Sequence, residues 1–155
     1  MDLTYTIRRA TVDDVMIITH QRRRMFTEMG NIDYTETPNM DTAYSEWLAP
    51  SLARGQYVGW LALDGSEVIG GTGAQMQEHP PMPVDLATQH MNLVNVYVEP
   101  DYRHRGIARA LVQTALDWCR AEGIRVVTLH ASNAGRPLYE SLGFQLTNEM
   151  RCIIE

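Results

Sequence analysis

A glycine-containing basic loop at residues 103–109 is the part of the sequence best suited to chemistry. It contains three arginines, one histidine and Gly106, and it follows a β-branched stretch that ends at Pro100. The residues after Gly106 have a helical pattern, and the unpaired N–H groups and positive dipole end of a helix start favour a phosphate. The pattern therefore predicts an anion site. The alternative is an ordinary strand–loop–helix junction with a basic surface.

Two short motifs, taken together, resemble the GNAT superfamily of acyl-CoA-dependent N-acyltransferases. Residues 103–108 match its Arg/Gln-x-x-Gly-x-Gly/Ala signature, and the preceding Val-x-Val-x-Pro-x-Tyr context matches as well. Residues 138–144 are similar to its Leu-Tyr-x-x-x-Gly-Phe element at the expected distance downstream. The resemblance in element order covers essentially the whole chain.

The resemblance implies direct transfer of the acetyl group of acetyl-CoA, in a ternary complex, to a primary amine of a small molecule or peptide. The pantetheine arm would pair with the backbone of residues 96–98 where two parallel strands splay apart. The loop and the start of the helix would hold the pyrophosphate. The implied cofactor-binding residues are Val96, Tyr97, Val98, Arg103, His104, Arg105, Gly106, Ile107, Ala108, Arg109, Ser132 and Asn133.

Tyr139 is the catalytic residue that the resemblance implies, as the general acid that protonates the departing thiolate. The alternative is an aromatic side chain that only packs on the sheet. Ser132 stands where many members carry a CoA-binding asparagine, and Asn133 is its neighbour. Val127 stands where some members carry a glutamate base. Water, an acidic residue such as Glu28, or His130 remain as bases.

An acidic segment between residues 25 and 53 is the expected acceptor wall. It contains no basic residue but several carboxylates, among which Glu28 and Asp33 are the candidate substrate-binding residues. Carboxylates attract cationic amines, although such a run is also typical of a solvated face. Just before this segment, residues 22–24 are all arginine, and a solvated face is the favoured interpretation over a cleft-lining role for one of them.

The hydrophobic periodicity predicts an α/β fold in one domain, residues 1–155, with helices on both faces of a mixed sheet. Strands are expected at 5–10, 56–63, 67–77, 91–98, 125–130 and 144–154, and the glycines at 70, 71 and 73 indicate a bulge or a close backbone approach in the third of them. Helices are expected at 11–30, 42–53 and 107–122, with a short one ending at Gly143. Thr11 and Asp14 suit a capping box at the start of the first helix. In the second helix, Tyr44 and Trp47 are expected to point inward, and Pro50 is expected to kink or divide it. The resemblance makes this a GNAT fold, with a mostly antiparallel sheet and a splayed central parallel strand pair.

Bulk properties narrow the class of protein and its partners. The net charge of −6 argues against nucleic acid. The sequence has neither an apolar run of membrane-spanning length nor a signal-peptide pattern at its start, so we expect no membrane association and a cytoplasmic location. Cys119 and Cys152 are expected to be reduced, and the scattered histidines predict no metal site.

Two other classes of protein remain as alternatives to the enzyme. One is a catalytically silent acyl-CoA-binding or sensing protein, which the departures at Ser132 and Val127 leave open. The other, less favoured, is a P-loop or Rossmann nucleotide-binding protein, whose motifs are incomplete here. A homodimer is common among the proteins that the sequence resembles, and we carry it as an expectation.

Overall fold

The computed structural model describes residues 4–30, 34 and 37–154 and contains both helices and strands. The elements are, in order, β1 (Thr6–Arg9), α1 (Val15–Met29), α2 (Met40–Ala53), β2 (Tyr57–Asp64), β3 (Glu67–Glu78), β4 (Gln89–Val98), α3 (Ile107–Ala121), β5 (Val127–Leu129) and α4 (Arg136–Ser141). Short 3-10 turns at Val12–Asp14 and Pro100–Tyr102 precede α1 and α3. The predicted α/β class is confirmed.

The strands form one mixed sheet in the order β1-β2-β3-β4-β5. The first four are antiparallel to their neighbours, and β5 is parallel to β4. The two-residue connection after Asp64 includes Gly65 at a φ of 58°, as a tight hairpin requires. The parallel pairing follows from α3, because a helix between two strands returns the chain in the same direction.

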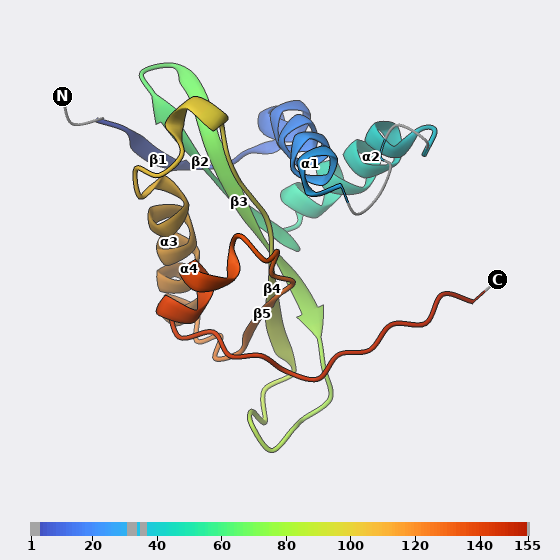
Figure 1. Ribbon diagram of the computed structural model, residues 1–155. Helices are drawn as coiled ribbons and strands as arrows, with labels where there is room; N and C mark the ends of the chain where they lie inside the picture. The colour runs from blue at the N-terminus through green and yellow to red at the C-terminus, as the bar shows by residue number, and fades with distance from the viewer. Residues whose placement is uncertain (1–3, 31–33, 35–36, 155) are drawn as a thin grey trace.

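The two faces of the sheet carry separate hydrophobic clusters, because strand side chains alternate between faces. Val58, Trp60 and Ala62 of β2 pack in the cluster that contains α3. Tyr57 and Leu61, the intervening residues, pack in the cluster with α1 and α2. Figure 1 shows α3 and α4 on one face of the sheet and α1 and α2 on the other.

Helix α3 follows the apolar stripe that its sequence predicts. Ile107, Leu111, Ala115 and Cys119, spaced four residues apart, are all buried against the sheet. Burial raises the pKa of the Cys119 thiol to about 11, so it stays protonated at neutral pH. Cys119 and the exposed Cys152 are both free thiols.

The start of the α1 region is fixed by the predicted capping box. The Thr11 hydroxyl accepts from the Asp13 N–H, and the Asp14 carboxylate accepts from the Thr11 N–H at 2.8 Å. Arg8 donates to the same carboxylate, and this hydrogen bond is the main cause of the lowered pKa of Asp14. At the other end, Gly30 adopts a φ of 64° and its N–H donates to the Phe26 carbonyl, which ends the helix as expected.

Two sequence predictions differ from the structure. Helix α2 begins at Met40 and continues through Pro50 to Ala53 without being divided there. The strand expected at 144–154 is wrong, because the described residues after Gly143 belong to no strand. We name residues 144–154 the C-terminal arm, and Figure 1 shows it running away from α4. Its alternating apolar residues favour a strand, but a strand forms only where a partner edge accepts its hydrogen bonds.

Among the described residues, no helix is both long enough and apolar enough to cross a membrane.

Replacing the buried Leu111 by alanine tests the packing of α3. Leu111 is fully buried, so Leu111→Ala should lower the free energy of unfolding by about 2–5 kcal/mol through lost burial and a residual cavity. Arg120→Ala, on the exposed side of the same helix, should change it by about 0.5 kcal/mol at most. Urea unfolding followed by circular dichroism measures both. Equal effects of the two substitutions would contradict the assigned helix face.

Candidate active site

A large open cavity lies along one edge of β4 and has a volume of about 1380 Å³. Its walls come from α1, α2, β4, the start of α3, and the stretch from the end of β5 to α4. Ordinary small-molecule sites have volumes of about 300–1,000 Å³. The cavity is therefore large enough for an extended ligand together with a second small molecule.

The cavity exists because β4 and β5 pair over only part of their length. Residues 91–93 of β4 lie opposite residues 127–129 of β5, and the pairing then ends. Residues 94–98 continue along β3 on their other side, whereas no described strand pairs with them on the cavity side. This is the predicted splayed parallel pair. It leaves backbone groups of a strand edge available to a ligand.

A β-bulge centred on Asn95 bends β4 beside the cavity. Gly71 pairs with Tyr97 and Gly73 with Val94, so one residue of β3 lies opposite two of β4. Asn95 adopts a φ of 57°, a left-handed conformation that asparagine tolerates better than most residues. The predicted irregularity at the glycines of β3 is thus confirmed.

The buried Asn95 side chain connects β4 to the helices on the α1 and α2 face. Its amide nitrogen donates to the hydroxyls of Tyr44, at 2.7 Å, and Tyr57, at 3.1 Å. Its amide oxygen accepts from Nη1 of Arg22 at 2.9 Å. The network fixes the Arg22 guanidinium beside the bulge, between the rings of Tyr44 and Phe26 at 4.4 and 4.7 Å.

The start of α3 forms one end of the cavity. Gly106 has a φ of 79°, and among the described residues no side chain caps the helix, so its first N–H groups face the cavity unpaired. Arg103 lies beside them, where its Nε donates to the Val98 carbonyl at 2.8 Å and its Nη2 pairs with Glu28 at 2.6 Å. Unpaired N–H groups at the positive helix end suit an anion.

Tyr139 reaches the cavity from α4, and its ring packs edge-on against Phe144 with centroids 5.9 Å apart. Only 9% of the residue is exposed, and its hydroxyl has no hydrogen-bond partner within the described part of the chain. Burial raises the pKa of this phenol, so it is protonated at neutral pH. Nearby, the Ser132 hydroxyl accepts from the Gly135 N–H at 3.1 Å and keeps its own proton available for donation.

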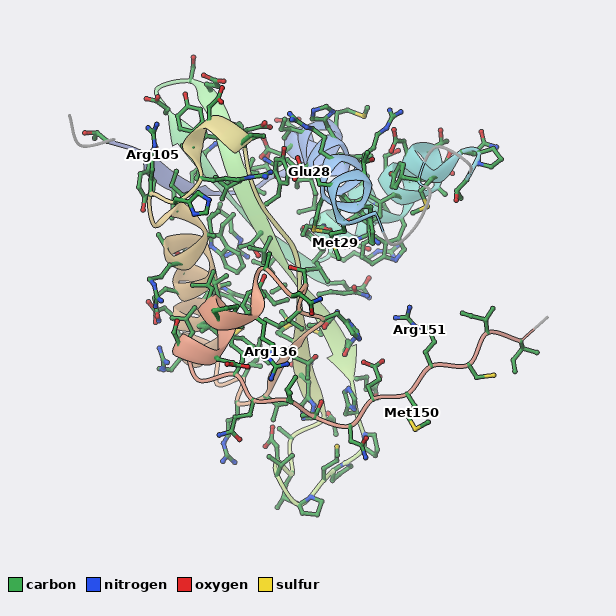
Figure 2. All side chains as sticks on the ribbon, viewed as in Figure 1. Glu28, Met29, Arg105, Arg136, Met150 and Arg151 are labelled. Atoms are coloured by element: carbon green, nitrogen blue, oxygen red, sulfur yellow. The ribbon has the colours of Figure 1, made fainter. Side chains whose placement is uncertain are left out.

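The structure brings most of the predicted site residues to this cavity. Those that line it are Glu28, Val96, Tyr97, Val98, Arg103, His104, Gly106, Ile107, Ala108, Arg109, Ser132, Asn133 and Tyr139. Arg105 does not; it is exposed, stacks 5.7 Å from the Tyr102 ring, and points outward from the loop before α3 (Figure 2). Asp33 lies outside the described residues. The roles assigned to all these residues remain predictions.

Two of the three carboxylates of the acidic segment that the structure describes are paired with arginines. Glu28 pairs with Arg103, as described, and Asp41 pairs with Arg23 at 3.3 Å. Tyr34 also hydrogen-bonds Asp41, and burial together with this carboxylate raises the pKa of Tyr34 to about 12. Among the described residues that line the cavity, Glu28 is the one carboxylate.

No dedicated base stands out among the described residues of the cavity. Val127, where a glutamate was considered, is an apolar residue of β5. His130 lines the cavity, but its Nε2 lies 2.5 Å from a carboxylate oxygen of Glu149 in the C-terminal arm. Among the described residues, no three His, Cys, Asp or Glu side chains gather where they could hold a metal ion.

Sequence reasoning missed most of the wall formed by α1 and α2. Tyr44 and Trp47 were expected only to pack inward, yet both line the cavity, as does Phe26. Arg22 also lines it, in the role that was the less favoured interpretation of its arginine run. One signal could have found part of this network: Asn95 is a polar residue of β4 whose two sequence neighbours, Val94 and Val96, are apolar.

A strand edge opened beside an uncapped helix start, with a buried phenol across the gap, defines an enzyme-like site for an extended anionic ligand. Known proteins give the family. The model of the acetyltransferase (GNAT) family matches residues 19–144, and the chain belongs to this family.

Solved structures share both the fold and part of the sequence. A GCN5-related N-acetyltransferase from Ralstonia eutropha is 34% identical, with a TM-score of 0.92 over 97% of this chain and 99% of that one. A predicted acetyltransferase from Clostridium acetobutylicum, solved with acetyl-CoA, is 25% identical, with a TM-score of 0.86 over 97% of this chain and 96% of that one.

Curated relatives match a shorter part of the chain. Human N-acetyltransferase 8B is 35% identical in an alignment of 96 residues that covers 58% of this chain and 39% of that protein. The match thus spans about two fifths of the relative's length.

Proposed function

We propose that the protein transfers the acetyl group of acetyl-CoA to a primary amine of a small molecule or peptide, directly and in a ternary complex. The observation that carries the proposal is the cavity along the unpaired edge of β4, with the uncapped start of α3 at one end and Tyr139 beside it. The similar protein from Clostridium acetobutylicum was solved with acetyl-CoA, which supports this choice of donor.

The donor would lie along β4. Its pantetheine amides would exchange hydrogen bonds with the open backbone of residues 96–98, as an added strand would. Its pyrophosphate would sit at the first N–H groups of α3, with Arg103 and Arg109 adding positive charge. Ser132 and Asn133 line the opposite wall and would hold the arm from the α4 side.

Acetyl transfer would then proceed by attack of the neutral amine on the thioester carbonyl. Formation of the new C–N bond gives a tetrahedral intermediate, and a backbone N–H of the β4 edge stabilises its oxyanion. The C–S bond breaks as this oxyanion collapses, and the leaving thiolate takes the proton of Tyr139. The amine loses its own proton to solvent, Glu28 or His130. Because the pKa of Tyr139 is raised, the phenol is protonated again before the next turnover.

Removing the Tyr139 hydroxyl tests the catalytic assignment. Tyr139→Phe should lower the turnover by about 10²–10⁴-fold, the usual contribution of a general acid, and leave CoA affinity nearly unchanged. Tyr5→Phe removes a hydroxyl that does not line the cavity and serves as the matched control. Thiol release from acetyl-CoA over a panel of amines is the measurement. Undiminished turnover in Tyr139→Phe would rule out the general-acid role.

The same panel separates the enzyme from the silent acyl-CoA-binding alternative. An active enzyme releases thiol with at least one amine, whereas a silent binder holds CoA and releases none.

Two matched glycine substitutions test the phosphate site. Gly106 and Gly123 lie at opposite ends of α3, have φ values of 79° and 74°, and have open space where a Cβ would be. A glutamate at either position meets similar backbone strain, on the order of 1–2 kcal/mol. Only Gly106→Glu places a carboxylate beside the proposed pyrophosphate, so it should weaken CoA binding by about tenfold or more. Titration calorimetry measures the affinity of both variants for CoA, and equal affinities would contradict the proposed phosphate site.

Homodimerisation is also part of the proposal. Leu146, Met150 and Ile153 of the C-terminal arm are 70%, 92% and 77% exposed, which makes the arm a surface for a second copy. Light scattering on the full chain should give twice the mass of the monomer, and a monomeric mass would contradict this part.

The cytoplasmic location remains a prediction.

A further inference from the structure

The part of the cavity wall that belongs to α1 and α2 offers positive charge and apolar surface together. Arg22 lies there at the β4 bulge, and Phe26, Tyr44 and Trp47 surround it or lie on the same wall. Among the described residues, no carboxylate lies within ion-pair distance of Arg22. Its neighbour Arg23, by contrast, pairs with Asp41.

The Arg22 guanidinium has hydrogen-bonding capacity that the protein does not use. Of its five N–H donors, one on Nη1 reaches Asn95, while the buried Nε finds no acceptor in the described part of the chain. A partly buried cation without an anionic partner is costly, and ring contacts offset only part of that cost. A ligand carboxylate could supply the missing acceptor through charge-assisted hydrogen bonds.

The charges around the cavity also favour an anionic group on the ligand. Glu28, the one described carboxylate in the lining, is neutralised by Arg103 at 2.6 Å. Arg151 of the C-terminal arm adds a further cation to the lining, across from the α1 side where Glu28 and Met29 lie (Figure 2). Among the described residues that line the cavity, arginines therefore outnumber carboxylates, which favours an acceptor that carries an anionic group besides its amine.

We infer that the acceptor is an α-amino carboxylate with an apolar side chain, whose carboxylate binds Arg22 and whose side chain packs on Phe26, Tyr44 and Trp47. This inference rests on the proposed acetyl transfer and names the acceptor class for the same site. The hydrogen bond from Arg22 to Asn95 places the carboxylate subsite next to the β4 bulge. An amine attached to the carbon that bears the carboxylate then lies close to the thioester proposed at residues 96–98.

A matched set of acceptors tests the carboxylate directly. L-Phenylalanine, phenylalaninamide and phenethylamine share the amine and the apolar body but differ in the anionic group. Because a hydrogen bond to a charged group is worth more than a neutral one, kcat/KM for phenylalanine should exceed those of the other two by about ten- to a hundredfold. The comparison is made across a range of pH, so that differences in amine protonation are removed. Equal values for the three acceptors would overturn the inference.

Substitutions at Arg22 test whether this residue causes the preference for an acceptor with a carboxylate. Arg22→Gln should reduce the ratio of kcat/KM between phenylalanine and phenethylamine to about one, and Arg22→Lys should retain part of it because the charge remains. Arg23→Gln, one position along α1 and exposed, is the control and should keep the wild-type ratio. CoA affinity, measured on every variant, reports whether the domain is folded. An unchanged ratio in a folded Arg22→Gln variant would overturn the role of Arg22.

A binding measurement distinguishes failure of this inference from failure of the proposed function. N-Acetyl-L-phenylalanine should bind the wild-type protein, in the presence of CoA, more tightly than N-acetylphenethylamine, and Arg22→Gln should remove the difference. If no amine supports thiol release but this difference is present, acetyl transfer is wrong and the carboxylate subsite stands. If thiol is released with phenethylamine and neither turnover nor binding prefers the carboxylate, the transferase stands and the subsite is wrong.

Discussion

The early end of the β4–β5 pairing is the constraint on which the site depends. A strand in the middle of a sheet normally forms backbone hydrogen bonds with two neighbours, but among the described strands residues 94–98 pair only with β3. The bulge at Asn95 makes this arrangement possible, because its extra residue bends β4 away from the direction that β5 follows. Three side-chain hydrogen bonds hold the bulge, and two of them end on buried tyrosine hydroxyls. The open edge is thus built into the core.

The helices then divide the open edge between two kinds of wall. Helix α3 contributes backbone, since its uncapped N–H groups and Gly106 face the cavity and no described side chain competes for them. Helix α1 contributes side chains, since Arg22 and Phe26 project from a regular helix toward β4. A backbone site recognises features common to all phosphates, whereas a side-chain wall depends on residue type. The first suits a shared cosubstrate and the second suits a particular acceptor.

The sequence predicted the elements whose signals are local and missed contacts that form only in the folded chain. The apolar spacing of α3, the Thr11–Asp14 capping box and the loop around Gly106 all lie within short segments, and each was found. Arg22, Tyr44 and Asn95 come from three different elements and meet only after the sheet and helices have packed. The prediction of a strand in the C-terminal arm was wrong for the opposite reason. Its apolar residues alternate as in a strand, but a strand needs a neighbouring strand, which no local pattern specifies.

The separation of the core into two clusters has a consequence for how such a protein can diversify. The proposed donor side of the cavity lies next to the cluster around α3 and α4, and the proposed acceptor side lies next to the cluster around α1 and α2. The sheet lies between them, so replacements in one layer leave the packing of the other largely intact. Duplicated copies of such a gene can therefore acquire new acceptors by changing one layer while inheriting an unaltered cosubstrate pocket.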